Sequence, residues 1–145
     1  MPGFELIGKE EQEEVNDVFK SGGVLFRHGF EDKRNNCFKV IKFEEMFKKK
    51  IGSKYALAVT SGTAALRVAL ATLNLKPNDE VITQAFTFVA TVEAIIESKA
   101  KPIISEIDET LNMDPEDLEK KINKNTKAVI VVHMLGTPCN IFKIK

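Results

Sequence analysis

The hydrophobic and polar positions of residues 9–52 follow the period of amphipathic helices. A charged helix is expected over 9–20, with Val15, Val18 and Phe19 on one side and a pair of glycines after its end. A second helix is expected to end at Gly52, and its apolar residues have the spacing of one helix face: Phe43, Met46, Phe47 and Ile51. An aromatic and methionine stripe of this kind is most simply core packing.

The central stretch, 55–75, combines a strand pattern with a helix pattern. Tyr55–Val59 is a short apolar run bounded by a turn, which is typical of a buried strand. Small and hydroxyl residues follow at 60–63. Apolar residues then recur with helical spacing, at Leu66, Ala69, Leu70 and Leu73. The sequence therefore predicts a strand, a tight turn and a helix in that order.

The second half of the chain alternates strand patterns with helix patterns. Strands are expected over 80–83, 101–107 and 127–132, and helices over 86–98 and from 115 onward. Asp114 and Pro115 suit the N-cap and the first position of the later helix, whereas Val89, Val92 and Ile96 mark one face of the earlier one. The repeated alternation predicts an α/β fold, with helices on both faces of a parallel sheet.

Composition narrows the classes of function. The 145 residues suit one ordinary domain, and 43% hydrophobic and 29% charged residues are typical of a soluble globular protein. Basic and acidic residues balance at 21 each, so we expect neither a nucleic acid nor a membrane as partner. Cys37 and Cys139 form no metal-ligand pattern, and we expect free thiols in a reducing compartment, with the cytoplasm as the default.

Two positions could bind a ligand. The start of the helix after Ser61 presents backbone N–H groups and the positive end of the helix dipole, Gly62 lacks a Cβ, and Thr63 adds a hydroxyl. This combination suits a phosphate, although an ordinary helix cap has the same residues. Phe88 lies where a strand passes into a helix, the place where open α/β sheets bind ligands, but an aromatic there is more often core.

Eight short segments, in order, resemble one known family. They are FEE (43–45), GSKYALAV (52–59), SGTAAL (61–66), DEVI (79–82), TFVAT (87–91), AKP (100–102), NMDPED (112–117) and TKAVIVVH (126–133). Their order and spacing resemble the DegT/DnrJ/StrS family of pyridoxal-phosphate-dependent sugar aminotransferases, a branch of the aspartate aminotransferase fold. Each segment is weakly specific alone, whereas the combination over roughly residues 5–140 is highly specific.

The resemblance implies a fold and a cofactor site. The fold is three-layer αβα with a mainly parallel sheet, the large domain of PLP-dependent transferase fold type I, incomplete in this chain. Residues 1–40 would form an N-terminal helix and irregular segment, and residues 41–145 the first part of the PLP-binding domain. Gly62, Thr63 and Ala64 would bind the phosphate of pyridoxal 5'-phosphate (PLP), and Phe88 would stack on its pyridine ring.

The resemblance also implies a reaction and a partner subunit. The family moves an amino group, usually from glutamate, through pyridoxamine phosphate (PMP) to a keto group on a nucleotide-linked sugar, at sites shared by a homodimer. Its Schiff-base lysine and its pyridine-pairing aspartate lie well beyond the position of His133, so no catalytic residue is assigned in this chain. The expectation is an N-terminal portion, inactive alone. The alternatives are a PMP-dependent sugar dehydratase relative or a non-catalytic binding or dimerisation module.

Overall fold

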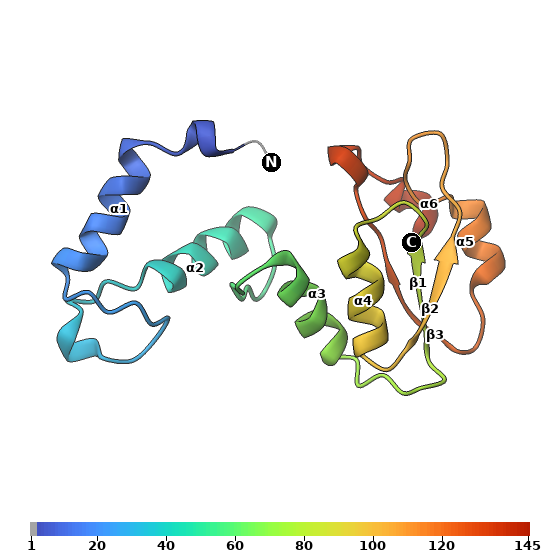
Figure 1. Cartoon of the computed structure of the whole chain (residues 1–145), viewed down its shortest axis with the longest axis horizontal. Helices are drawn as coiled ribbons and strands as arrows, with labels where there is room; N and C mark the ends of the chain where they lie inside the picture. The colour runs from blue at the N-terminus through green and yellow to red at the C-terminus, as the bar shows by residue number, and fades with distance from the viewer. Residues whose placement is uncertain (1–2) are drawn as a thin grey trace. The chain divides into compact units, whose positions relative to one another are not determined.

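The computed structural model describes residues 3–145 (Figure 1). The chain separates into two compact units, Met1–Ala58 and Val59–Lys145, which are described one at a time. The boundary expected after residue 40 lies within the helix Lys39–Ile51 (α2). No helix of the described residues combines the length and the apolar character that crossing a bilayer requires.

The first unit contains helices and loops. Its elements are η1 (Phe4–Leu6), α1 (Lys9–Lys20), η2 (Glu31–Lys33) and α2 (Lys39–Ile51). The prediction of α1 is confirmed, and the Glu11 carboxylate accepts the Gly8 N–H at 2.7 Å at its start. Gly52 ends α2 in the left-handed region, at φ 75°, a conformation that favours glycine. Both helix ends therefore follow from the local sequence.

The apolar stripe of α2 is not buried in this unit. Met46 is 63% exposed and Phe43 is 56% exposed, so the expectation of core packing is wrong for this unit. The physical reason is that an amphipathic helix buries its apolar face only where another element covers it. The buried side chains of the described part of the unit are instead two charged ones, Arg34 and Glu44.

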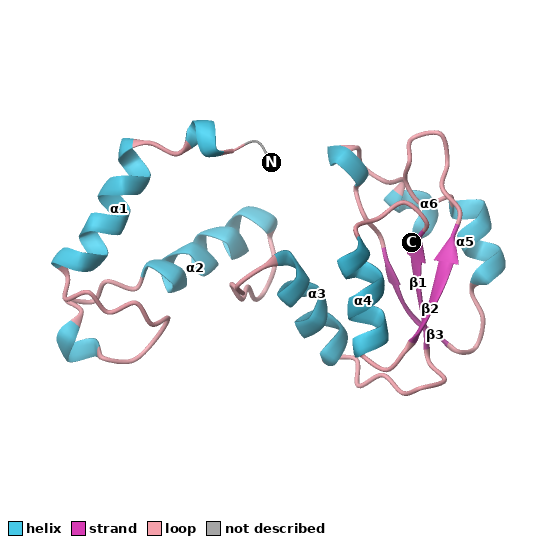
Figure 2. Ribbon diagram, viewed as in Figure 1, coloured by secondary structure: helices cyan, strands magenta, loops and turns pink. Residues whose placement is uncertain are grey.

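The second unit is built on a parallel sheet of three strands (Figure 2). They are β1 (Glu80–Gln84), β2 (Lys101–Ser105) and β3 (Thr126–Ile130), and the order in the sheet is β2-β1-β3. The helical elements are α3 (Gly62–Ala71), α4 (Val89–Glu97), α5 (Pro115–Lys121), η3 (Met134–Gly136) and α6 (Ile141–Ile144). Ile82 of the central strand pairs with Ile103 on one side and with Val129 on the other.

Two hydrophobic clusters lie on opposite faces of this sheet. One contains Leu70 of α3 and Ile95 of α4 against Val81. The other contains Leu118 of α5 against the neighbouring strand residue, Ile82. Because successive strand residues point to opposite faces, the two clusters confirm the predicted layering of helix, sheet and helix.

The strand expected at Tyr55–Val59 is wrong, since this run has no strand partner in the structure. Tyr55 is 77% exposed, and the backbone N–H of Ala58 donates to the Glu44 carboxylate at 2.9 Å instead of to a neighbouring strand. An apolar run becomes a strand only when a ladder pairs its backbone groups. The helix after it, α3, is confirmed.

The face of α4 that carries Val89, Val92 and Ile96 is not its buried face. Val89 and Ile96 are largely exposed, whereas Ala94 and Ile95 are buried against the sheet. The helix is hydrophobic over much of its circumference, so the spacing of its larger residues did not identify the buried side. The start of α5 is confirmed, since the Asp114 carboxylate accepts the Glu116 N–H at 2.9 Å and Pro115 occupies the first turn.

Candidate active site: the carboxyl edge of the sheet

Three loops leave the sheet at the edge where its strands end. Residues 85–88 follow β1, residues 106–114 follow β2 and residues 131–140 follow β3. Because the strands are parallel, all three loops start on the same edge. Open α/β sheets bind their ligands at this edge, so it is the candidate site of the second unit.

The start of α3 offers free backbone donors. The Ser61 hydroxyl accepts the Ala64 N–H at 3.1 Å, so Ser61 is the N-cap of this helix. Within the part of the chain that the structure describes, the N–H groups of Gly62 and Thr63 have no acceptor. These two donors and the helix dipole favour an anion at this position.

Neither local backbone geometry nor packing requires glycine at position 62. Its φ is not positive, and a Cβ built there would meet no atom within 4 Å. Thr63 is partly buried in the first turn of the same helix. Glycine does keep the backbone N–H groups accessible to a group that approaches from outside.

Phe88 is the N-cap residue of α4, and its ring is 74% exposed. The interpretation of this aromatic as a core residue is therefore wrong. Its backbone begins the helix, since its carbonyl oxygen accepts the Thr91 N–H at 3.0 Å. The structure thus places a flat apolar ring in the open at the carboxyl edge.

The helices that carry Phe88 and the proposed phosphate-binding turn, α4 and α3, pack against each other. Leu66 and Leu70 of α3 belong to the same cluster as Ile95 of α4, and Arg67 pairs with Glu97 at 2.6 Å. In Figure 1 the two helices run in the same general direction, and both end near the edge where the strands begin. The structure records no direct contact between Phe88 and residues 62–64.

Two buried carboxamides, which the sequence analysis did not single out, connect the loops at this edge. Gln84, the last residue of β1, is fully buried. Its Nε2 donates to the carbonyl oxygens of Phe86 at 3.1 Å and Leu111 at 3.3 Å, and its Oε1 accepts the Val132 N–H at 3.1 Å. One side chain therefore joins the loops that follow β1, β2 and β3.

The second carboxamide, Asn112, joins two of these loops. Its Nδ2 donates to the Thr110 hydroxyl at 3.0 Å and to the Thr137 carbonyl at 3.2 Å, and its Oδ1 accepts the Met134 N–H at 2.9 Å. These contacts lie on both sides of Leu135, a non-glycine residue with φ 52°. Such a strained backbone persists where its surroundings determine it. In the sequence, Asn112 is the first residue of the segment NMDPED, whereas Gln84 belongs to none of the eight segments.

A carboxylate fixes the start of the loop after β2. The Asp117 carboxylate accepts the Glu106 N–H at 2.7 Å and pairs with Lys121 at 2.6 Å. The hydrogen bond from Lys121 and that from the Glu106 backbone lower the pKa of Asp117. At the end of the loop after β3, the Cys139 N–H donates to Nδ1 of His133 at 3.0 Å. The Asp117 carboxylate and Nδ1 of His133 therefore hold the backbone of these two loops.

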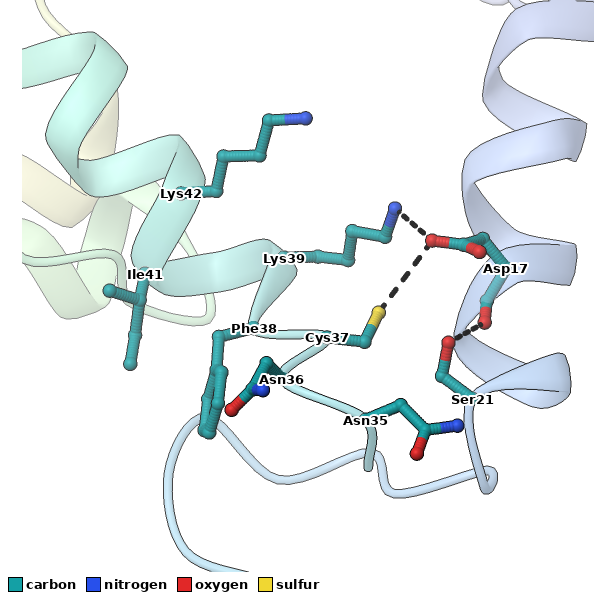
Figure 3. Close-up of a pocket in the computed structure, with 9 residues that line it drawn as sticks. All are labelled: Asp17, Ser21, Asn35, Asn36, Cys37, Phe38, Lys39, Ile41 and Lys42. Atoms are coloured by element: carbon teal, nitrogen blue, oxygen red, sulfur yellow. Dashed lines mark hydrogen bonds and ion pairs between the residues drawn. The ribbon is translucent and has the colours of Figure 1, made fainter. Parts of the chain in front are cut away.

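A pocket of about 510 Å³ lies in the first unit (Figure 3). Lys39 and Asp17 of its lining are paired, since Lys39 contacts Asp17 and Glu14 at 2.6 Å each. The hydrogen bonds to Asp17 and Glu14 raise the pKa of Lys39. The hydrogen bond from Lys39 in turn lowers the pKa of Asp17. Figure 3 shows the Cys37 sulfur directed at the same carboxylate, 3.7 Å away. The ion pairs of Lys39 therefore join α2 to α1 at this pocket.

The described residues hold no group of three or more His, Cys, Asp or Glu side chains that could bind a metal ion. Both cysteines are free. The groups available at the carboxyl edge are backbone amide and hydroxyl donors and an exposed aromatic ring, a set that suits an anionic, flat organic group.

Comparison with known proteins defines the class. The model of the DegT/DnrJ/EryC1/StrS aminotransferase family matches residues 5–145, so the chain belongs to this family, as the resemblance implied. The family depends on PLP, and the matching solved structures include PLP and PMP forms of one protein. The expected cofactor and fold type are therefore confirmed at the level of the family.

Individual relatives are similar over nearly all of this chain. It is 42% identical to the uncharacterized protein MJ1066 of Methanocaldococcus jannaschii, over 99% of this chain and 35% of the relative. It is 42% identical to the spore coat polysaccharide biosynthesis protein SpsC of Bacillus subtilis, over 94% and 33%. It is 38% identical to GDP-perosamine synthase of Vibrio cholerae, over 93% and 35%. The chain thus spans about a third of the length of these relatives.

Solved structures match to a similar extent. An aminotransferase from Psychrobacter cryohalolentis matches with a TM-score of 0.82 and 33% identity, over 99% of this chain and 34% of that one. The Streptococcus pneumoniae protein Spr1654, in its PMP form, matches with a TM-score of 0.82 and 29% identity, over 95% and 33%. The fold of this segment is therefore that of PLP-dependent aminotransferases, although the segment covers about a third of each.

Proposed function

We propose that the full-length protein is a PLP-dependent aminotransferase that moves an amino group from glutamate to the keto group of a nucleotide-linked sugar. In this proposal the present segment supplies part of the cofactor site and none of the covalent chemistry. The observation that carries the proposal is a helix start with two unpaired amides, at the position where the family motif SGTAAL occurs. Relatives named for spore coat polysaccharide and GDP-perosamine synthesis support a sugar substrate.

In the proposal, the start of α3 binds the phosphate of the cofactor. Gly62 and Thr63 would donate their free N–H groups, and the Thr63 hydroxyl would add a third donor. The Ala64 N–H already donates to Ser61, so Ala64 would contribute mainly through its place in the same turn. The partial positive charge of the helix start complements the phosphate dianion.

Phe88 would orient the cofactor ring. Its exposed ring offers a flat apolar face, which would stack on the pyridine ring and exclude water from one side. When bound, PLP supplies an electron sink and a carrier for the amino group. The residues of this segment would bind and orient it, and no described lysine is assigned to the covalent step.

We also propose that the full-length protein acts as a homodimer, as the family resemblance implies. The sheet of this segment has three strands, and its outer strands β2 and β3 pair on one side only. The unpaired backbone groups of such edge strands need further strands or another chain to cover them. The rest of the protein and a second subunit would complete the site.

The proposal is tested with the full-length protein loaded with PLP. Glutamate should convert the cofactor to its PMP form, which is followed by absorbance, and a nucleotide-linked keto sugar should then restore the PLP form. If a simple keto acid restored the PLP form and the nucleotide-linked keto sugar did not, the assigned substrate class would be contradicted. No spectral change with any amino donor would contradict the aminotransferase itself.

The cofactor site is tested with a pair of threonine variants on the same helix. Thr63→Val should weaken PLP binding roughly 10-fold or more, because a hydrogen bond to a charged group contributes about 1.5–3 kcal/mol. Thr72→Val is the matched control, since Thr72 caps the far end of α3 and bonds to Ala69 at 2.7 Å. Equal affinities for the two variants, or binding of phosphate-free pyridoxal as tight as that of PLP, would contradict the site.

A further inference from the structure

The carboxamide of Gln84 lies where the loops after all three strands converge. We propose that Gln84 is a positioning residue, which holds the backbone that presents the exposed Phe88 ring to the cofactor. This inference rests on the proposed function, because Phe88 has a cofactor to face only in a PLP enzyme. It adds a residue that acts through Phe88 and touches no ligand itself.

The contacts of Gln84 use the full donor capacity of its side chain. Its two N–H donors go to Phe86 and Leu111, and its oxygen accepts from Val132. A carboxamide has two N–H donors, so none is left for a ligand. Because the side chain is also fully buried, any effect of Gln84 on a ligand must pass through the backbone segments that it holds.

Phe86 is the contact that links Gln84 to Phe88. Only residues 85–88 lie between β1 and α4. Within this short segment, the Gln84 side chain donates to the carbonyl oxygen of Phe86 and so holds its backbone. At the next residue, the hydroxyls of Thr87 and the buried Thr91 lie 2.9 Å apart. The backbone is thus held on the approach to Phe88, whereas the Phe88 ring itself is exposed. An exposed ring on a fixed backbone is what a preorganised stacking surface requires.

The position of the second carboxamide separates this role from simple support of the fold. Asn112 is as buried as Gln84 and has the same number of hydrogen bonds, but its partners are Thr110, Met134 and Thr137. None of them belongs to the segment between β1 and α4. A substitution of Asn112 therefore perturbs the same edge of the sheet. It leaves the segment between β1 and α4 with the hydrogen bonds of Phe86 and Thr87 intact.

The first experiment measures amide hydrogen exchange in the full-length protein without cofactor. Gln84→Met keeps the size of the side chain and removes its donors and acceptor. The Thr91 amide, which bonds to the Phe88 carbonyl, and the Ala85 amide, which bonds to Ser105, should exchange at least 10-fold faster. Asn112→Leu should accelerate the Met134 amide instead. Unchanged exchange at Ala85 and Thr91, or equal acceleration by both variants, would overturn the proposal.

The second experiment measures the cofactor directly. Gln84→Met should weaken PLP binding about 10-fold and reduce the circular dichroism of the bound cofactor, which reports the orientation of its ring. Asn112→Leu should change the affinity less than 3-fold and keep the dichroism. Gln84→Glu serves if the methionine variant does not fold, because it keeps the acceptor for Val132 and removes the donors to Phe86 and Leu111.

The two proposals fail in different ways. If the unmodified full-length protein does not bind PLP, the proposed function is contradicted, and the positioning role falls with it. If the unmodified protein binds PLP and both glutamine variants bind it with the same affinity and dichroism, the positioning role alone is contradicted. Faster exchange at Ala85 and Thr91 together with weaker binding and lower dichroism supports both.

Discussion

The two units of this protein bury different kinds of side chain. The second unit buries hydrocarbon on both faces of a sheet, as at Val81 and Ile82. In the described part of the first unit, the buried side chains are Arg34 and Glu44. The comparison teaches that one unit has a hydrophobic core of its own, whereas the other is held by polar contacts around two charges.

The Glu44 carboxylate shows how the first unit is held. Arg27 donates to both of its oxygens, at 2.9 and 2.5 Å, and the Ala58 N–H donates to one of them at 2.9 Å. The hydrogen bonds from Arg27, and then that from Ala58, lower the pKa of Glu44. One carboxylate thus ties the loop before α2 and the chain after α2 to that helix.

Arg34 organises the loop between α1 and α2. Its guanidinium donates to the carbonyl oxygens of Cys37, Gly29 and Phe26, at 3.1, 3.0 and 2.9 Å, and lies 4.2 Å from the centre of the Phe38 ring. A buried charge is tolerated when its donors are satisfied in this way. The polar contacts define the shape of the loop, but they bury little hydrocarbon.

The largest expected effect comes from the same substitution made in each unit. Ile82→Ala should lower the free energy of unfolding of the second unit by about 2–5 kcal/mol, because Ile82 is fully buried. Ile51→Ala, at a residue 62% exposed in the first unit, should change the free energy by less than about 0.5 kcal/mol. Urea unfolding followed by circular dichroism measures both, and a larger effect at Ile51 would reverse the comparison.

The next effect depends on pH and concerns the first unit. The pKa of Glu44 is lowered in the folded state, so its contribution to stability is present above its ordinary value of 4.5 and is lost as the pH falls through the lowered pKa. At pH 7, Glu44→Gln should therefore accelerate amide exchange over residues 39–58. The difference from the unmodified protein should shrink as the pH falls.

Exchange in the second unit is the control for Glu44→Gln. Residues 80–84 of β1 should exchange at the same rate in both proteins, since the hydrogen bonds of Glu44 go to Arg27 and Ala58, both in the first unit. A difference that grows toward low pH would contradict the role of ionised Glu44. Acceleration confined to β1 would contradict its place in the first unit.

A smaller effect is expected at a helix cap of the second unit. Asp114→Ala should cost about 0.5–2 kcal/mol, because the Glu116 N–H loses its acceptor at the start of α5. Asp32→Ala, at an exposed residue of η2 in the first unit, is the matched control and should have little effect. Thermal unfolding of both variants measures the difference, and equal melting temperatures would contradict the cap.

The smallest effect is expected for a surface ion pair of the first unit. Lys9 and Glu13 lie 3.7 Å apart, one turn apart on α1, and both are well exposed. Lys9→Met should leave the urea midpoint unchanged within error, because solvent screens such pairs. A clear loss of stability would show that exposed charges, and not the buried Glu44, hold the first unit together.

Local signals predicted most helix ends and the order of most elements. Gly52 ends α2 and Asp114 with Pro115 begins α5, because a left-handed terminus and an N-cap are properties of one or two residues. The alternation of strand and helix patterns gave the parallel sheet of the second unit. The ordered set of family motifs predicted the family that the comparison shows.

The failures occurred where the outcome depends on a distant partner. Tyr55–Val59 has a strand pattern, but its Ala58 N–H goes to Glu44. The exposed ring of Phe88 and the exposed stripe of α2 show that an apolar residue is not always buried. For the candidate site, the helix start was visible in the sequence, whereas the network of Gln84 was not, because hydrogen bonds between loops leave no periodic pattern.

The sequence by itself determined the class of fold, the family and the helix start that we propose as the phosphate site. These depend on interactions within a few residues or on the order of motifs along the chain. Only the tertiary structure decided that Glu44 and Gln84 are buried and which segments they join, since their partners lie 14 and 48 residues away. Polar side chains gain such partners only when the folded backbone brings the segments together.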